Sequence, residues 1–274
     1  MIKGIVVTMN LSSKIYKIYQ KYFFEKYNQV RGAVKLHDFL KDQAQKTLPK
    51  PEKEPEGIFE KEDWDNLLII DACRHDLYEE VEGQTSKRTT LGGHSREFLE
   101  KTFSEGDFSD VVYISGNFHL NTGLFEKATG RKPEEVFHTV YHTHETDWEE
   151  TGIVHPEAVI RDAKSAAKLF PDKKLIVHFM QPHHPFKSLD LSEYEETSIW
   201  KLAERGEFDD STIWEHYKKN LEFVMPYVRE LSEELDGKTI LTSDHGNLVG
   251  ENNLYHHPYG SSSKPVREVP WTEI

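Results

Sequence analysis

Short apolar runs that end in polar side chains are the sequence feature that most restricts the fold of this chain. Each run begins with aliphatic residues typical of a buried strand and ends in hydroxyl, carboxylate or imidazole groups. Three such segments are Leu67–Asp71, Leu175–His184 and Thr239–Gly246. In open α/β sheets functional groups gather at the carboxyl ends of strands, so three ends of this kind can converge on one site. We therefore expect Asp71, Asp244 and His245 to form a metal-binding core.

The segments between these runs have helical patterns. Strand-like runs lie near 66–71, 111–115, 136–141, 174–180 and 238–243. Amphipathic helical patterns cover 95–103, 156–170 and 211–235. Strands that alternate with helices predict a mostly parallel sheet with helices on both faces, which is an α/β fold.

Residues 1–50 are expected to form a helical extension. Apolar and aromatic residues recur at steps of three or four over 11–30, and a second helix is expected over about 32–46. Lysines are interleaved with the first stripe, so this helix either contacts a membrane surface or a partner, or packs across the main domain. A Pro/Glu linker is predicted over 51–58, and it separates the extension from a domain formed by residues 59–274.

Composition excludes several classes of protein. The chain has 274 residues and a formal net charge of −14, which disfavours an electrostatic nucleic-acid binder. This acidity fits solubility better than adaptation to high salt. The lone cysteine, Cys73, excludes an intramolecular disulfide and a multi-cysteine zinc site. The sequence lacks an apolar run of the roughly 20 residues that span a bilayer. Its start lacks the pattern of a signal peptide, so we expect a cytoplasmic protein.

The metal site is predicted from the residue types at two strand ends. A carboxylate such as Asp71 is costly to bury unless it is paired or bound to a metal. Arg74 offers the alternative of a structural ion pair with Asp71 or Asp76. Asp244 and His245 are adjacent in a tight turn, so both can face one ion. Carboxylate oxygens and one imidazole suit a single divalent ion such as Mn²⁺, Mg²⁺, Zn²⁺ or Ca²⁺.

Two His-His-Pro segments suggest an anion site. His183 and His184 follow the strand expected over 174–180, and His256 and His257 precede a second proline. The chain contains 15 histidines, so these four could also be ordinary surface residues. We favour the interpretation that they hydrogen-bond an oxyanion, such as phosphate or sulfate.

Three segments together resemble the alkaline phosphatase/sulfatase superfamily, and most closely its compact, mostly archaeal sulfatase-like group. They are Asp63–Asp76, His178–Phe186 and Thr242–Gly246, and Arg267–Trp271 also resembles the end of those proteins. The resemblance covers residues 59–271. It implies an alkaline phosphatase-like α/β sandwich whose central sheet is largely parallel and whose first-strand aspartate and late Asp-His pair bind the metal.

The resemblance also implies a hydroxyl nucleophile at a helix start. Within residues 89–96 the first choice is Ser95, which stands at the start of the predicted helix, and the second is Thr90. The alternative for Ser95 is a plain N-cap. His184 would act as a catalytic residue, and His256 or His257 would bind non-bridging oxygens or protonate the leaving group. Arg74 and His183 are further candidates for substrate binding.

Several departures from the superfamily pattern restrict the chemistry. Neither Cys73 nor Ser95 lies in the sequence that sulfatases convert to formylglycine. Gln181 and two histidines occupy the region where two-metal members carry an Asp-x-x-x-His unit, so one metal is expected, with His183 and His184 as cationic anion binders in place of the second ion. The expected activity is hydrolysis or transfer of a phosphate or sulfate ester.

Other functions remain open on the sequence. A catalytically silent family member would act as a binding module, and a lipid-linked phosphotransferase would dock through its aromatic N-terminal helix. The substrate, the choice between phosphate and sulfate, the identity of the metal and the oligomeric state are not predicted.

Overall fold

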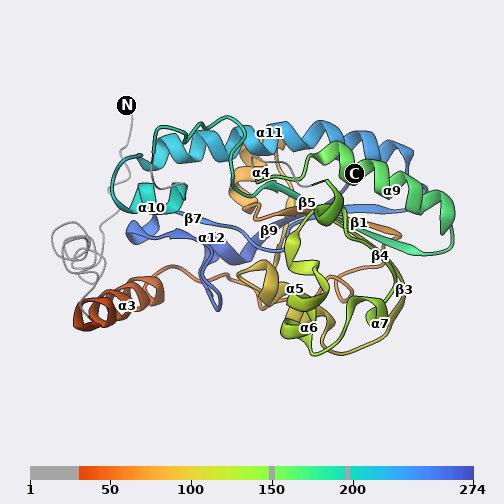
Figure 1. Cartoon of the computed structure of the whole chain (residues 1–274), viewed down its shortest axis with the longest axis horizontal. Helices are drawn as coiled ribbons and strands as arrows, with labels where there is room; N and C mark the ends of the chain where they lie inside the picture. Colours follow the sequence, from red (N-terminus) through yellow and green to blue (C-terminus); the bar gives the residue numbers. More distant parts are fainter. Residues whose placement is uncertain (1–30, 148–151, 195–197) are drawn as a thin grey trace.

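A seven-stranded sheet forms the centre of the computed structural model, which describes residues 31–147, 152–194 and 198–274. The strand order is β2-β9-β6-β1-β5-β3-β4, and Figure 1 shows the sheet between layers of helices. The strands are β1 (Asn66–Asp71), β2 (Ser86–Thr89), β3 (Phe108–Ser115), β4 (Phe137–Tyr141), β5 (Lys174–Pro182), β6 (Thr239–Thr242) and β9 (Glu268–Glu273). A separate pair contains β7 (Leu248–Val249) and β8 (Tyr255–His256).

Most of the sheet is parallel. β1 lies between β5 and β6 and is parallel to both, while β3 is parallel to β4 and β5. Only β9 runs against its neighbours, β6 and β2. The predicted α/β class, with a mostly parallel central sheet flanked by helices, is confirmed. Its parallel strands bring their carboxyl ends to one edge.

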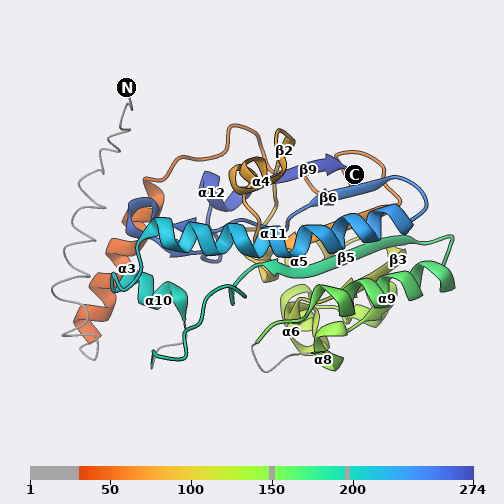
Figure 2. The ribbon, with the colours of Figure 1, turned by 90° about the horizontal axis from the view of Figure 1, so that it is seen from above.

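Helices cover both faces of this sheet. The longer ones are α3 (Arg31–Lys46), α4 (His75–Glu82), α5 (Ser95–Phe103), α6 (Thr122–Thr129), α9 (Pro156–Leu169) and α11 (Asp210–Glu234). The shorter ones are α7 (Pro133–Val136), α8 (Thr143–Thr146), α10 (Ile199–Glu204) and α12 (Lys264–Arg267). Figures 1 and 2 show α9 and α11 on one side of the sheet, with α5 and α6 on the other.

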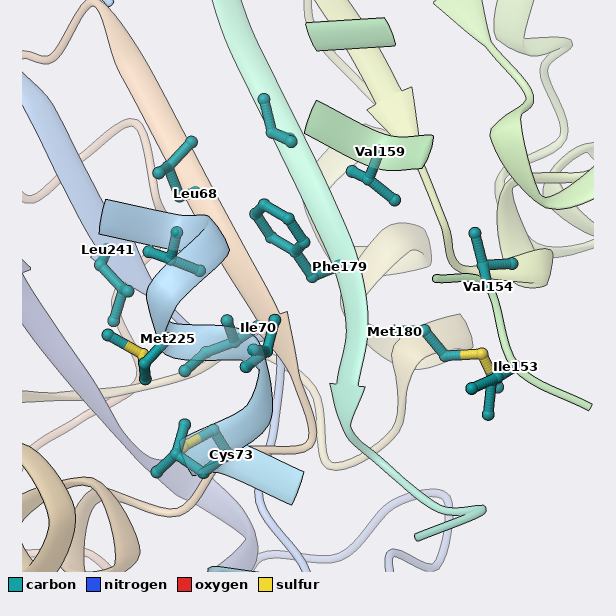
Figure 3. Packing of buried hydrophobic residues seen from close by; sticks show 14 of the residues in the cluster. Leu68, Ile70, Cys73, Ile153, Val154, Val159, Phe179, Met180, Met225 and Leu241 are labelled. Carbon is teal, nitrogen blue, oxygen red and sulfur yellow. The ribbon is translucent and has the colours of Figure 1, made fainter. Parts of the chain in front are cut away.

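The alternation of side chains along each strand builds two cores. Leu68 and Ile70 of β1 pack with residues of α9 and α11, and Figure 3 shows them beside Phe179, Met225 and Leu241. The intervening Leu67 and Ile69 pack against α5 and α6. A strand buried on both faces is continuously apolar, which explains why the sequence of β1 becomes polar only at its end.

Two strands of the central sheet, and the short strands β7 and β8, are absent from the sequence-based prediction. β2 is too polar to resemble a strand, and β9 contains Pro270. β2 is the edge strand and β9 lies next to it. At an antiparallel edge, hydrophobic periodicity and residue composition predict a strand less clearly than they do for buried parallel strands. The five predicted strands and the helices over 95–103, 156–170 and 211–235 are present with small shifts of their ends.

The helix expected over 32–46 is α3, while the stripe at 11–30 lies outside the described residues. Ala44 of α3 belongs to a small apolar cluster with Leu248, Leu254 and Val266, and Lys41 pairs with Glu204 of α10 at 3.0 Å. α3 is thus docked beside the segment that carries His256 and His257. Within the described part of the chain, no helix has the length and apolar character needed to cross a membrane. The boundaries at 50, 58 and 59 remain predictions.

Candidate active site

The three predicted metal ligands meet at the carboxyl edge of the sheet. Asp71 is the last residue of β1, and Asp244 and His245 follow the adjacent parallel strand β6. All three are buried, and one ligand atom from each lies within 4.8 Å of the others. Adjacent parallel strands therefore bring together residues that are far apart in the sequence.

Hydrogen bonds fix the turn that carries Asp244. Its Oδ1 accepts from the backbone N–H of Ala72 at 3.0 Å and from that of His245 at 2.9 Å. Ser243 Oγ accepts from the N–H of Cys73 and donates to the carbonyl of His245. One carboxylate oxygen of Asp244 is thus used by the loop, which leaves Oδ2 for the site.

Glycine at position 246 allows the backbone to approach another segment closely. A Cβ added at Gly246 would lie 2.2 Å from the carbonyl oxygen of Pro265 and 2.9 Å from the Arg74 side chain. Backbone atoms cannot yield as a flexible side chain does, so a larger residue would displace the Asp244-His245 turn. The site therefore depends on close packing behind it.

Ser95 is the first residue of α5, and its hydroxyl faces the metal ligands. The N-cap is His94, whose Nδ1 accepts from the N–H of Arg96 at 3.1 Å. Ser95 is therefore not the N-cap of this helix. Its Oγ lies 3.1 Å from His245 Nε2 and accepts from Asn117 Nδ2, also at 3.1 Å.

Asn117, which was not predicted as a site residue, links the serine to the metal ligands. Its Nδ2 also donates to Asp71 Oδ2 at 2.6 Å, and its Oδ1 accepts from the N–H of His119. The sequence feature that could have predicted Asn117 as a site residue is its position just after the apolar run at 111–115. This strand end has the same form as the three that were identified.

His178 is a second residue that the predictions omitted. It is buried inside β5, where its Nδ1 is 3.0 Å from the Tyr113 hydroxyl and its Nε2 is 3.6 Å from Asp244 Oδ2. Burial and the neighbouring imidazole of His245 lower the pKa of His178 to about 4, although the charge of Asp244 acts in the opposite direction. The signal in the sequence was a single ionisable residue within a buried strand.

The buried polar atoms of this site fit a divalent cation. Asp71 Oδ1, Asp244 Oδ2 and His178 Nε2 have no hydrogen-bond partner among the described residues. His245 Nε2 lies 3.5 Å from that oxygen of Asp71 and 3.4 Å from that of Asp244. The carbonyl of Gly246 accepts from His245 Nδ1 at 2.9 Å, so Nε2 of the neutral ring presents a lone pair. Two carboxylates, an imidazole and a hydroxyl suit Zn²⁺ or Mn²⁺.

The pKa shifts of Asp71 and Asp244 also fit a bound cation. Burial and then the charge of Asp244 raise the pKa of Asp71 well above its usual range. Burial also opposes ionisation of Asp244, but His245 and His178 outweigh it and lower its pKa. A bound cation would compensate both buried charges.

Histidines line a cavity of about 180 Å³ in front of these residues. The lining residues are Asp71, His94, Ser95, Asn117, Phe118, His119, Met180, His183, His184, His256 and His257. The rings of His256 and His257 stack with centroids 3.9 Å apart, and His257 is 4.2 Å from His245. His256 has a φ of 74°, a left-handed conformation that non-glycine residues adopt rarely and often at functional sites.

These histidines are neutral at pH 7, which corrects the expectation that His183 and His184 are cationic. Burial, followed by repulsion between the rings, lowers the pKa of both residues well below its usual value. The same two causes lower the pKa of His256 to about 3 and that of His94 to about 4. Burial therefore disfavours imidazolium charge in this cavity.

Thr90 lies behind the site. Its hydroxyl donates to the backbone carbonyl of Asp244 at 2.7 Å, and the residue is fully buried. It does not line the cavity. This contact supports the turn rather than presenting a nucleophile.

Arg74 also lies outside the cavity. Its guanidinium pairs with Asp76 at 2.6 Å and with Glu251 at 2.5 Å, and it donates to the carbonyl of Asn247. The ion pair with Asp76, considered as an alternative from the sequence, is the observed contact. Its donors are used to fasten the loop after His245.

Comparisons with solved structures identify similar folds. One match is the integral membrane protein lipooligosaccharide phosphoethanolamine transferase A from Neisseria meningitidis, with a TM-score of 0.51, 14% identity, and coverage of 95% of this chain and 59% of that chain. The soluble domain of the same transferase matches with a TM-score of 0.50 and 13% identity, over 83% of this chain and 80% of that chain. A protein in the alkaline phosphatase superfamily from Vibrio parahaemolyticus has a TM-score of 0.39 and 10% identity, over 86% and 67% of the two chains.

These similarities are structural. No protein-family model matches the chain, and no curated protein matches its sequence. The chain spans about three-fifths of the full-length transferase, since it covers 59% of that protein. This chain and the soluble domain of that transferase therefore share a fold.

Proposed function

We propose that this protein transfers or hydrolyses phosphoesters at a single divalent metal ion, with Ser95 as the nucleophile. Asp71, Asp244 and His245 would hold the ion. The observation that carries the proposal is the position of Ser95 Oγ, 3.1 Å from His245 Nε2 and 3.1 Å from Asn117 Nδ2. Ser95 thus contacts one candidate metal ligand, His245, directly, and shares the amide of Asn117 with a second one, Asp71. A serine that only started the helix would not need these contacts.

The surroundings of Ser95 would favour its ionised form. Asn117 donates a hydrogen bond to Oγ, and the start of the nine-residue helix α5 favours negative charge there. When bound, the metal would lower the pKa of the hydroxyl and stabilise charge on the transferring group. The hydroxyl could then attack phosphorus at neutral pH.

The proposed reaction has two displacement steps. In the first, Ser95 loses its proton to a neutral cavity imidazole or to water while a bond forms between its Oγ and phosphorus, the bond from phosphorus to the leaving oxygen breaks, and that oxygen takes up a proton from the resulting imidazolium or from water. In the second, water or an acceptor hydroxyl attacks the phosphoseryl group, loses its proton and releases Ser95. His184 remains our candidate for this imidazole because it lines the cavity, and its neutral ring would accept a proton before donating one.

Neutral histidines would bind the non-bridging oxygens. His94 Nδ1 accepts from the N–H of Arg96, so the proton of its neutral ring is on Nε2, and the residue lines the cavity. A ring held in this tautomer is a hydrogen-bond donor without net charge. His256 lines the same cavity and is proposed to share this role. His183 Nδ1 donates to the carbonyl of His184, and His257 Nδ1 donates to Asn247 Oδ1 at 2.6 Å, so these two rings would bind an anion through Nε2 only when that nitrogen is protonated.

Phosphate is favoured over sulfate. The structural neighbour with a TM-score of 0.51 is described as a phosphoethanolamine transferase, and the chain lacks the formylglycine sequence around Ser95. Transfer and hydrolysis differ only in the second step, in which either an acceptor hydroxyl or water attacks the phosphoseryl group. The cytoplasmic location and a peripheral membrane contact through the N-terminal helix remain predictions, because that helix lies outside the described residues.

Turnover of aryl esters tests the proposal. The metal-loaded protein should hydrolyse an aryl phosphate or phosphodiester more efficiently than an aryl sulfate, and Ser95→Ala should abolish this activity. Ser109→Ala, at an exposed serine on β3, is the matched control and should leave turnover unchanged. Wild-type protein with neither bound metal nor turnover would contradict the proposal and favour a binding module.

A further inference from the structure

A second group of metal-ligand side chains lies at the carboxyl end of β4, outside the cavity that holds Ser95. His142, His144 and Glu145 each offer one ligand atom, and these atoms lie within 4.8 Å of one another. β4 is the edge strand beyond β3, so this group occupies the same edge of the sheet as Asp71 but is separated from it by two strands. None of its members takes part in the proposed reaction.

His144 is held with a free lone pair facing this group. The residue is 6% exposed, and its Nδ1 donates to the backbone carbonyl of Ser115 at 3.2 Å. In the neutral ring, Nε2 is therefore the unprotonated nitrogen. That atom has no hydrogen-bond partner among the described residues and lies 3.8 Å from Glu145 Oε1.

His142 brings a second imidazole to the same place. The His142 and His144 ring centroids are 5.6 Å apart, and His142 Nε2 lies 3.8 Å from Glu134 Oε1. Glu145 is positioned by Asn121, whose Nδ2 donates to Oε1 at 2.7 Å. Glu134 accepts from the Thr122 hydroxyl at 3.1 Å. Two carboxylates thus flank the two rings, and both are held by residues at the start of α6.

The backbone that carries these ligands is anchored on the opposite side. Thr143, between the two histidines, donates through its hydroxyl to Asp162 of α9 at 2.8 Å. Arg161 of α9 pairs with Asp147, just after α8, at 2.8 Å. The turn from β4 into α8 is therefore fixed without using the ring nitrogens, which reduces the cost of ordering a metal site.

We propose that His142, His144 and Glu145 form a second metal site, which binds a zinc-class transition metal ion. Two imidazoles and a carboxylate suit Zn²⁺, while Mg²⁺ and Ca²⁺ prefer sites made only of oxygens. Water or Glu134 would supply the fourth ligand. Because His144 also holds the end of β3 through Ser115, the bound ion would fasten β4 and α8 to β3.

Metal stoichiometry tests this site independently of catalysis. The full-length protein, stripped with a chelator, is titrated with zinc chloride by calorimetry and with cobalt chloride by visible absorption. The wild type should bind two equivalents, His144→Gln and His142→Gln one each, and Asp244→Asn one. His138→Gln removes an exposed histidine from the same strand and should bind two equivalents.

The variants separate the two metal proposals. If His144→Gln binds as much zinc as the wild type, the second site is absent. If one equivalent remains in Asp244→Asn and is lost when His144→Gln is added, the second site stands even if the active-site metal fails. Glu145→Gln changes a more exposed residue, should leave the fold intact and should weaken zinc binding at this site by roughly tenfold or more. Unchanged affinity in that variant would also overturn the inference.

Discussion

The hydroxyl oxygen of Ser95 lies 3.1 Å from Nε2 of His245, although 150 positions separate the two residues in the sequence. This contact joins the start of α5 to the loop after β6. It brings the candidate nucleophile to a site that already contains two buried carboxylates.

Asn117 should be important for turnover more than for substrate binding. Its amide donates to Ser95 Oγ at 3.1 Å and to Asp71 Oδ2 at 2.6 Å, so Asn117→Ala removes a donor where negative charge develops. We expect kcat to fall by roughly 100-fold, with a smaller change in KM. Steady-state kinetics on an aryl phosphodiester measures this split. A rise in KM at unchanged kcat would show instead that Asn117 only binds substrate.

Metal removal should destabilise the wild type more than the variant Asp71→Asn. Burial and the charge of Asp244 raise the pKa of Asp71, so ionising both carboxylates of the metal-free site is costly. With the chelator present, Asp71→Asn should be at least as stable as the wild type. A metal at 100 times its Kd for this site should stabilise the wild type by about 2.7 kcal/mol more than Asp71→Asn, which keeps the proposed site at His144. Thermal unfolding with and without zinc measures both effects, and equal stabilisation of the two proteins would contradict the ligand assignment.

Acid should destabilise the metal-free protein through its buried histidines. The pKa is lowered to about 3 in His119 and His256 and to about 4 in His94 and His178, from an ordinary value of 6.5, and burial is the main cause. Between these values the unfolded chain binds more protons than the folded one, so stability falls as the pH decreases below 6.5.

The size of this effect is up to about 1.4 kcal/mol per pH unit for each fully buried histidine. Urea unfolding between pH 4.5 and 7.5 measures it. His119→Gln should flatten the dependence, while His138→Gln, at an exposed position, should not. Stability that increases toward pH 4.5 would contradict this account.

Thr90 should affect stability and leave the covalent chemistry intact. Its hydroxyl donates to the carbonyl of Asp244 at 2.7 Å in a fully buried position, so Thr90→Val leaves that carbonyl unpaired. We expect a loss of about 1 to 3 kcal/mol in the free energy of unfolding. Thr90→Ser keeps the hydrogen bond and serves as the matched control. Complete loss of turnover in Thr90→Val with the fold retained, together with turnover kept in Thr90→Ser, would revive Thr90 as the nucleophile.

Much of the site was predictable because buried parallel strands have a clear sequence pattern. Asp71, Asp244 and His245 interrupt or follow apolar runs, and adjacent strands bring such ends together. Ser95 was predictable as a residue at a helix start. The sequence pattern does not show what the Ser95 hydroxyl contacts, because the N-cap of α5 is His94 rather than Ser95.

Other residues required the three-dimensional structure. Arg74 is three positions from Asp71, yet Ala72 has a φ of 60°, and the chain turns so that Arg74 meets Glu251. Asn117 gave only a weak signal because a single amide after a strand is common in turns. The strand β9 runs against its neighbour β6, so the rule for parallel strand ends does not apply to it.

The most direct test of the central claim is to trap the covalent intermediate. Metal-loaded protein is mixed with an aryl phosphodiester, quenched in acid during the first turnover and digested, and the phosphorylated peptide is sequenced by mass spectrometry. We predict that Ser95 of the wild type carries the phosphorus of the substrate with its second ester substituent still attached, and that no residue carries it in Ser95→Ala. Turnover without a labelled Ser95, or a label on another residue such as Thr90, would contradict the proposed mechanism.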